Sequence, residues 1–123
     1  MTIAEVSKRY DISPDTLRYY ERVGLIPPVP RNANGIRNYD EASCSWIELI
    51  KCFRSAGVQV EALIEYRQLF EQGESTLYAR KQLLLGQREM LRERISELNA
   101  SLEKLDKKLK WYDDVISERK KEC

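Results

Sequence analysis

The sequence predicts a mainly α-helical protein with a winged helix-turn-helix head, followed by one long helix that pairs in a coiled coil. Three observations support this fold class. Two short helix signals separated by a tight turn lie before Gly24, a hairpin signal flanked by arginines follows, and apolar residues repeat with heptad spacing from Lys81 onward. We place the head in residues 1–74 and the long helix with its tail in residues 75–123.

The composition limits the classes of function. The chain has 123 residues, a net charge of +1, no histidine and three cysteines without metal-ligand spacing. It shows no signal peptide and no apolar run of membrane-spanning length, so we expect a reducing cytoplasm with free thiols. Since the common catalytic triads and zinc sites use histidine, we predict no enzyme, no catalytic residue, no metal and no cofactor.

The first residues carry two helix starts. Thr2 and Glu5 have the spacing of a capping box, in which each side chain satisfies a free backbone N–H group. Ser13 is then placed to cap a second helix, Pro14 fits its first position, and Gly24 is placed to end it. Two short helices joined by a turn of two or three residues form a helix-turn-helix.

Polar side chains recur on the outer face of the second predicted helix, opposite Leu17 and Tyr20. This outer face comprises Asp15, Arg18, Tyr19 and Arg22. Arginine binds phosphates or guanine with two hydrogen bonds, and tyrosine hydrogen-bonds phosphate. The pattern alone is equally typical of a solvated amphipathic helix.

The next segment predicts a two-stranded wing. Residues 27–30 are extended because three of them are prolines, and Asn34-Gly35 favours a hairpin turn because both residues tolerate positive φ. The two arms present Arg31 and Arg37. Four arginines and one acid lie between residues 18 and 39, which makes a basic patch in a nearly neutral chain. A hairpin that serves only as scaffold is the minority alternative.

Two further helices are expected to form the core beneath the helix-turn-helix. Asp40 is placed to cap the third helix and Gly57 to end it, and the fourth runs from about Val60 to Gly73. The apolar face of the third helix has the spacing i, i+3, i+4, i+7. It comprises Trp46, Leu49, Ile50 and Phe53, of which we assign Trp46 and Phe53 to the core.

The last helix, opened by Ser75, carries a coiled-coil seam. Counted from Lys81, the a and d positions alternate over five heptads. The predicted dimerisation residues are Leu84, Leu91, Ile95, Leu98, Leu102, Leu105, Leu109, Tyr112 and Ile116. Lys81 and Arg88 occupy the early a positions, so we expect the seam to open there. No other helix of the chain has this length, which predicts a homodimer; these residues leave its parallel or antiparallel orientation open.

The stretch from Met1 to Asp40 resembles the N-terminal domain of the MerR family of bacterial transcription regulators. The motifs TLRYYE (Thr16 to Glu21), GLI (Gly24 to Ile26), Pro28 and the run from Arg31 to Tyr39 carry the resemblance, which extends over essentially the whole chain. It implies an antiparallel coiled coil whose two heads each bind half of an inverted repeat. It also implies activation by bending and untwisting an overlong promoter spacer, so that RNA polymerase finds both promoter elements in register.

By this resemblance, the recognition helix and the wing contact double-stranded promoter DNA on the bacterial nucleoid. The predicted DNA-binding residues are Ser13, Thr16, Arg18, Tyr19, Arg22, Arg31, Asn32, Asn34, Arg37 and Tyr39. The family's large drug-binding domain and metal-binding cysteine loop are not expected in this chain.

Residues 47–63 (IELIKCFRSAGVQVEAL) resemble the small thiol-dependent subgroup of the family, which responds to aldehydes or to nitrosative and other electrophile stress. A cysteine at this place is the proposed sensor in that subgroup, which assigns the role to Cys52. Lys51 and Arg54 are expected to favour its thiolate. The alternative, a small buried core residue, stays open. Cys44 is expected to be inert, and Cys123 to be prone to an adventitious intermolecular disulfide.

Two other functions remain open. An effector-independent architectural DNA-binding protein would bind duplex DNA with little sequence preference and without an inducer. A coiled-coil adaptor would bind another protein through its head and would show no salt-dependent duplex binding. The second alternative leaves the arginines of the recognition helix and the wing unexplained.

Overall fold

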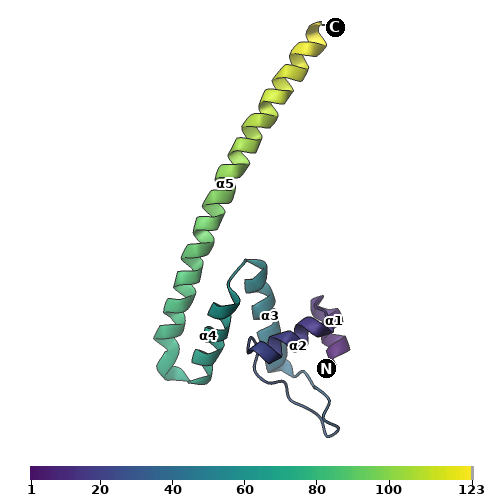
Figure 1. Ribbon diagram of the computed structural model, residues 1–123, viewed down its shortest axis with the longest axis vertical. Helices are drawn as coiled ribbons and strands as arrows, with labels where there is room; N and C mark the ends of the chain where they lie inside the picture. The colour runs from purple at the N-terminus through teal and green to yellow at the C-terminus, as the bar shows by residue number, and fades with distance from the viewer. Residues whose placement is uncertain (123) are drawn as a thin grey trace. The chain divides into compact units, whose positions relative to one another are not determined.

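The computed structural model of the protein describes residues 1–122 and confirms a mainly α-helical fold (Figure 1). Its elements are α1 (Ile3–Tyr10), α2 (Pro14–Val23), α3 (Glu41–Ser55), α4 (Val60–Glu71), the 3₁₀-helix η1 (Glu74–Thr76) and α5 (Leu77–Glu122). Cys123, and with it the predicted disulfide, lies outside the described residues. The chain divides into two compact units, a head unit (Met1–Gln87) and a tail unit from Arg88 onward. This division lies within α5, after the boundary predicted at residue 74.

The helix-turn-helix has the capping interactions expected from its sequence. Thr2 and Glu5 form a reciprocal capping box at the start of α1. Ser13 accepts a hydrogen bond from the backbone N–H of Thr16 at the start of α2, and Gly24 ends α2 with a φ of 84°. Between the helices, Asp11 takes a left-handed conformation with a φ of 54°. The turn therefore has the two to three residues typical of this motif.

One apolar core holds the head unit together. Leu17 and Tyr20 of α2 are buried as predicted, and they share this core with residues of every other helix up to α4. Its fully buried side chains are Val6, Leu17, Leu25, Ile26, Tyr39, Ile47, Ile50 and Leu63. On α3, however, Ile47 and Ile50 are fully buried, while Trp46 and Phe53 are only partly buried against the core. The face of α3 that enters the core is therefore centred on Ile47 and Ile50 and not on Trp46 and Phe53. Helical spacing alone did not distinguish the two faces, because both contain apolar residues and they overlap at Ile50.

The wing is a hairpin loop rather than the predicted pair of strands. Residues 1–122 contain no strand, and Arg31 and Arg37 form an isolated antiparallel bridge. The arms are joined by hydrogen bonds from the Asn32 N–H to the Ile36 oxygen, 2.8 Å, and from the Asn38 N–H to the Pro30 oxygen, 2.7 Å. The prolines of the first arm lack N–H groups, which prevents a longer ladder.

The turn of the wing also differs from the expected two-residue type. Gly35 has a φ of 76°, but Asn34 does not share a positive φ. The Gly35 N–H donates to the Asn32 oxygen, and Asn32 Oδ1 accepts from the N–H groups of Asn34 and Ile36 at 2.9 and 3.1 Å. These contacts make a three-residue loop with glycine in the left-handed position. The Asn32 side chain shapes this turn, because its Oδ1 accepts the N–H two residues later, the Asx-turn that asparagine favours.

The passage from α4 into α5 is a tight corner. Gly73 has a φ of 88°, and the Thr76 hydroxyl makes hydrogen bonds to the carbonyl oxygens of Leu69 and Gly73 at 2.6 and 2.8 Å. The last helix therefore begins at Leu77 after a 3₁₀ turn, and not at Ser75. Within the head unit, α4 and the first turns of α5 run side by side (Figure 1).

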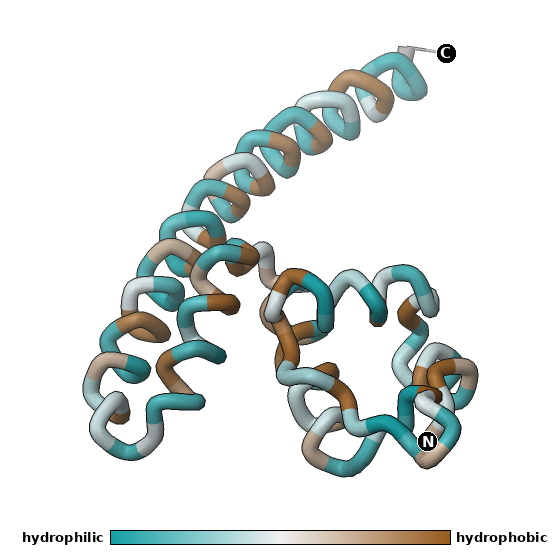
Figure 2. Tube along the Cα trace, turned by 60° about the horizontal axis from the view of Figure 1, so that its bottom comes forward, coloured by the Kyte–Doolittle hydropathy of each residue, from teal (hydrophilic) through white to brown (hydrophobic). Residues whose placement is uncertain are grey.

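The tail unit is a single helix with an exposed apolar stripe. Brown segments recur among teal ones along α5 in Figure 2, as the heptad pattern requires. Among the predicted dimerisation residues, Leu84 and Leu91 are half-buried and the rest are about half exposed, from 49% for Ile95 to 63% for Leu98. No helix in residues 1–122 is long and apolar enough to cross a membrane.

Replacing Ile47 by alanine tests the core. Because the Ile47 side chain is fully buried, Ile47→Ala is expected to lower the free energy of unfolding by about 2–5 kcal/mol. Ile36→Ala, at a position that is 58% exposed, should change it by less than about 0.5 kcal/mol. Urea unfolding at one fixed protein concentration measures both values, and equal effects would contradict the assigned core.

Candidate nucleic-acid interface

The outer face of α2 presents its predicted polar side chains to solvent. The Arg18 side chain is 47% exposed and pairs with Asp15, with 3.0 Å between Nη1 and Oδ1. The Arg22 guanidinium lies over the Tyr19 ring, 5.6 Å from its centroid. Because Leu17 on the opposite face is fully buried, this orientation of α2 is fixed by the core.

Ser13 and Thr16, two of the predicted DNA-binding residues, form the N-cap of α2. Ser13 Oγ accepts from the Thr16 N–H at 3.1 Å and donates to Thr16 Oγ1 at 2.8 Å. Both hydroxyls therefore already take part in the N-cap. The positive end of the α2 dipole lies here as well, which favours a phosphate near this end.

Three of the DNA-binding residues predicted in the wing are exposed on its loop. Arg31, Asn32 and Asn34 are exposed, and the Arg31 guanidinium donates to the Gly35 oxygen at 2.8 Å. This contact ties the first arm to the turn. The Asn32 side chain is engaged in the loop, whereas Asn34 contributes only its backbone N–H to that network.

Glu21 joins the wing to the recognition helix. Its Oε1 accepts from Arg37 Nε at 2.7 Å, and its Oε2 accepts from the Val29 N–H at 2.9 Å. The Glu21 side chain is only 15% exposed. Burial, the largest single influence, raises the pKa of Glu21, but the hydrogen bonds from Arg37 and Val29 and the charges of Arg37 and Arg31 outweigh it and leave the pKa below its usual value. Sequence reasoning missed this role, although Glu21 is the single acid between residues 18 and 39.

Tyr39 is placed differently from the other predicted contact residues. It is 1% exposed, and its hydroxyl is buried with no hydrogen-bond partner. Burial raises the pKa of Tyr39, and the nearby charge of Arg37 partly opposes this. A direct contact of Tyr39 with DNA does not fit this burial. Tyr39 instead packs in the core beneath the arginines, because it follows the wing at the point where the chain enters α3.

The two described cysteines differ in accessibility. Cys52 is exposed, which excludes the buried-core interpretation, and Cys44 is buried. The two cations next to Cys52 in the sequence each make a backbone hydrogen bond: Lys51 Nζ donates to the Tyr10 oxygen, and Arg54 Nη1 donates to the Val58 oxygen at 2.8 Å. Both cations therefore bind backbone carbonyl groups. Within residues 1–122 no cluster of three His, Cys, Asp or Glu residues could hold a metal ion.

Cys44 lies beside Tyr10 at a polar hollow of about 440 Å³ lined by residues of α1, α3 and the segment between the wing and α3. Burial, followed by the neighbouring Cys44 thiol, raises the pKa of Tyr10 to about 12. Cys44 is therefore a packed residue at the edge of the core, and it serves as an internal comparison for the exposed Cys52.

Comparison with known proteins supports the interpretation of the head. The family model for MerR HTH family regulatory proteins matches residues 1–69. The HTH-type transcriptional regulator AdhR of Bacillus subtilis (strain 168) is 56% identical over 91 residues, which cover 74% of this chain and 65% of that relative. The match thus spans slightly less than two thirds of the relative's length. An uncharacterized HTH-type transcriptional regulator of Haemophilus influenzae is 29% identical over 111 residues, which cover 90% of this chain and 82% of that protein.

Solved structures share the fold of nearly the whole chain. A regulator from Listeria monocytogenes assigned to the MerR family matches with a TM-score of 0.90 and 45% identity, over 92% of this chain and 86% of that chain. HiNmlR, a MerR family regulator lacking the sensor domain, was crystallised bound to promoter DNA. It matches with a TM-score of 0.82 and 28% identity, over 92% of this chain and 90% of its own. All these relatives are regulators and not enzymes.

The Glu21 ion pair predicts a pH-dependent stability. The folded state lowers the pKa of Glu21 below its ordinary value of 4.5, so the carboxylate stabilises the fold fully above that value and loses this effect as pH falls through the folded pKa. Glu21→Gln should lower the free energy of unfolding by about 1–3 kcal/mol at pH 7, since it removes a charged hydrogen-bond partner. The difference from the parent chain should shrink below pH 4.5 in urea unfolding. A difference that is constant with pH would contradict the assignment.

Proposed function

Because the chain belongs to the MerR HTH family of regulatory proteins, we propose that it binds a promoter inverted repeat as a homodimer and regulates transcription from that promoter. The observation that carries this proposal is the joined surface of α2 and the wing. Exposed Arg18, Arg22 and Arg31 lie on this surface, and Glu21 fixes Arg37 between the two parts. A recognition helix of this kind enters the major groove, while a wing contacts the backbone or the minor groove.

The homodimer is supported by the apolar stripe of α5. Leucine and isoleucine side chains at the a and d positions are about half exposed over several heptads, and such a stripe is buried when a second helix pairs with it. A two-fold dimer presents two recognition helices, and an inverted repeat has the matching symmetry. The crystallised complex of HiNmlR with promoter DNA supports DNA as the partner.

We further propose that the dimer activates by deforming DNA. Bending and untwisting an overlong spacer changes the register of the two promoter elements that RNA polymerase contacts. The regulator then acts through DNA shape and needs few contacts with bases. It acts on the bacterial nucleoid, in the cytoplasm, where promoter DNA and polymerase are found.

The proposed inducer is an aldehyde or a related electrophile, and Cys52 is the proposed sensor. The exposed thiol adds to the carbonyl carbon: a sulfur–carbon bond forms, the C=O π bond breaks, and the thiol proton ends on the carbonyl oxygen as a hemithioacetal. This addition needs no oxidant. The adjacent Lys51 donates to the Tyr10 oxygen at the C-terminal end of α1. A group attached to Cys52 thus lies next to a contact between α3 and the helix-turn-helix.

DNA binding is tested by fluorescence anisotropy on the duplex upstream of the chain's own gene, against a scrambled duplex at the same salt. We expect a preference of about 10³-fold or more for the promoter duplex. Equal affinity for both would favour the architectural alternative, and binding to neither would favour the adaptor.

Arg18→Ala should weaken promoter binding by about 1–3 kcal/mol, because a bidentate contact with a base has that magnitude. Arg92→Ala is the matched control, since Arg92 has the same i,i+3 ion pair with an acid, Glu89, but lies in the tail unit. Both dimers are titrated at a concentration where sedimentation shows them to be dimeric. An unchanged affinity of Arg18→Ala would remove Arg18 from the contact surface.

Cys52→Ser should bind the promoter with parent affinity but lose the transcriptional response to aldehyde in a reconstituted assay with RNA polymerase. Serine keeps the size of the side chain while its hydroxyl is a weaker nucleophile than a thiol. Cys44→Ser is the control at the buried position and should keep the response. Normal induction of the Cys52→Ser dimer would refute the sensor assignment.

A further inference from the structure

Each helix of the helix-turn-helix is held at its C-terminal end by a cation from α3 or α4. Lys51 of α3 donates to the oxygen of Tyr10, the last residue of α1. Arg67 of α4 donates through Nε to the oxygen of Gly24, the C-cap of α2. The carbonyl groups at the end of a helix lack partners within it and carry the negative end of its dipole, so a cation is favourable there. The recognition helix is thus fixed from α4.

The Arg67 guanidinium fits closely against the end of α2. A Cβ atom added at Gly24 would lie 3.1 Å from Arg67 Nη2, so the guanidinium occupies the space that a side chain would need. Nη1 of Arg67 pairs with Glu71, one turn later on α4. The Arg67 side chain is only 12% exposed, whereas that of Glu71 is 52% exposed. Two nitrogens of one planar group therefore serve two different partners, which fixes the orientation of the guanidinium.

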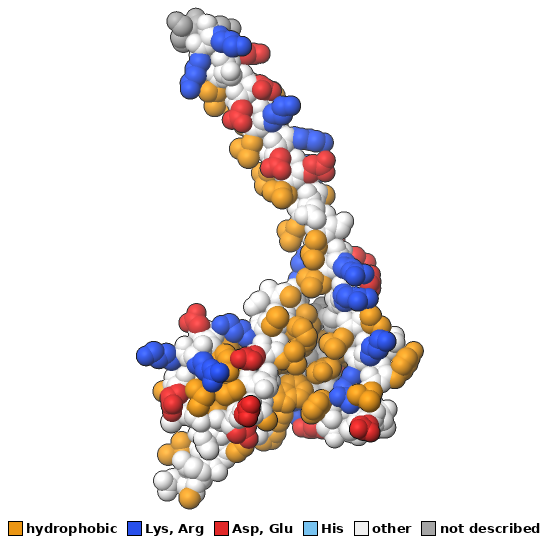
Figure 3. Space-filling view, turned by 180° about the vertical axis from the view of Figure 1, so that it is seen from behind, with side chains coloured by type: hydrophobic (Ala, Val, Ile, Leu, Met, Phe, Trp, Pro, Cys, Tyr) orange, Lys and Arg blue, Asp and Glu red, His pale blue; other side chains and the backbone are white. Residues whose placement is uncertain are grey.

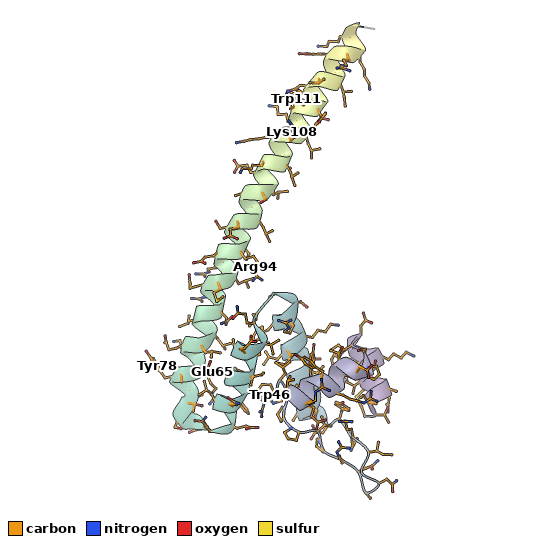
Figure 4. All side chains as sticks on the ribbon, viewed as in Figure 1. Trp46, Glu65, Tyr78, Arg94, Lys108 and Trp111 are labelled. Carbon is orange, nitrogen blue, oxygen red and sulfur yellow. The ribbon has the colours of Figure 1, made fainter. Side chains whose placement is uncertain are left out.

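Apolar side chains make further contacts of α4 within the head unit. Leu63 is buried in the core, and Trp46 of α3 meets Tyr66 and Phe70 edge to face, at 6.1 and 5.1 Å between ring centroids (Figure 4). Figure 3 shows hydrophobic side chains gathered on one face of the head unit. The hydrophobic effect has no direction, whereas a hydrogen bond requires alignment of donor and acceptor. Arg67 therefore adds a directional restraint between α4 and α2 to the apolar packing.

α4 passes directly into the helix that carries the coiled-coil seam. The corner between α4 and α5 is held by the Thr76 hydroxyl, and Arg80 donates to this hydroxyl and to the Gly73 oxygen at 3.1 and 3.2 Å. The first turns of α5 are thus fixed relative to α4 within the head unit. A series of directional contacts runs from α2 through Arg67 and this corner to the start of α5.

The separation of the two half-sites of an inverted repeat is a geometric demand on a dimer. One base pair inserted between them shifts the second half-site by about 3.4 Å and rotates it by about 34° around the DNA axis. Recognition helices that are rigidly joined to the dimerisation helices fit one separation. Recognition helices that are loosely joined adapt to several separations.

We propose that Arg67 is a positioning residue for DNA recognition, which ties the recognition helix to the dimerisation helix and thereby makes the homodimer selective for one separation of the half-sites. This inference rests on the proposed binding of a homodimer to an inverted repeat and adds a determinant of its specificity. Because Arg67 is largely buried, it acts through α2 and not by touching DNA. The exposed arginines supply the contacts with DNA, and Arg67 fixes where they stand.

The first test compares two duplexes, the inverted repeat located by footprinting in the promoter and the same duplex with one base pair inserted at its centre. The parent dimer should bind the inserted duplex at least about 30-fold more weakly, because one head misses its half-site. Arg67→Gln should bind the original duplex roughly tenfold more weakly, since its heads are less preorganised, and should distinguish the two duplexes less than about fivefold. Arg67→Lys keeps a cationic donor for the Gly24 oxygen and should fall between them.

The ratio of the two dissociation constants separates positioning from stability. A variant that was merely less stable would lose the same fraction of active dimer on both duplexes, and the ratio would not move. Arg54→Gln is the matched control, because the Arg54 guanidinium also donates to a backbone carbonyl, that of Val58, but across only four positions at the end of α3. It should keep the parent's ratio within about twofold, as expected for a site independent of Arg67.

Glu71→Gln serves as a second variant in case Arg67→Gln does not fold. It removes the ion pair that orients Arg67 at an exposed position, and it should lower the ratio in the same direction by a smaller factor. An unchanged ratio in Glu71→Gln and in every folded Arg67 variant would overturn the inference.

Salt dependence tests whether Arg67 touches DNA itself. Loss of one phosphate contact reduces the slope of log affinity against log salt concentration by about 0.9. Arg67→Gln should keep the slope of the parent dimer on the original duplex. A slope reduced by this amount would overturn the positioning role, because it would make Arg67 a direct contact.

The outcomes also separate this inference from the proposed function. A parent dimer that binds its promoter specifically but tolerates the inserted base pair would overturn the selectivity and leave promoter binding intact. A parent chain that stays monomeric, or that binds promoter and scrambled duplexes equally, would refute the proposed function and the inference with it.

Discussion

Glu21 accepts one hydrogen bond from Arg37 Nε and another from the backbone N–H of Val29, and through these contacts one side chain connects three parts of the head. It belongs to α2, Val29 opens the wing, and Arg37 lies on the returning arm. Val29 is also buried in the core. The exposed arginines are thus held on a surface whose shape depends on an ion pair largely removed from water. Such a pair costs desolvation energy, and its geometry makes the wing a defined part of the surface.

Interactions between residues close in the sequence were sufficient to predict where the helices of the head begin and end. The capping box at Thr2, the N-caps at Ser13 and Asp40, and the left-handed Gly24 are each decided by contacts within four residues, so they can be read from the sequence. The heptad stripe of α5 is equally local, because it depends only on helical spacing. The same holds for the outer face of α2, which is exposed as predicted.

Interactions between distant residues were not predictable in this way. Glu21 meets Arg37 sixteen positions later, and Lys51 meets the Tyr10 oxygen across 41 positions. Tyr39 follows exposed wing residues in sequence but turns into the core, which spacing cannot reveal. On α3, two overlapping apolar faces satisfied the same periodicity, and the packing partners selected the one with Ile47. Residue spacing in the sequence identifies the helices. The contacts between the helices decide which side chains are buried and which stay exposed for binding.

The arginines of the candidate surface are already engaged in the free protein: Arg18 with Asp15, Arg37 with Glu21, and Arg31 with the Gly35 oxygen. A phosphate that binds Arg18 displaces the exposed Asp15 carboxylate, which then attracts cations from solution. The net release of counterions is therefore smaller than the number of arginines suggests. Random DNA, which offers only phosphates, gains little from this exchange. In the proposed dimer, the internal partners thus restrain indiscriminate adhesion to the chromosome and leave the binding free energy to sites whose shape fits both heads.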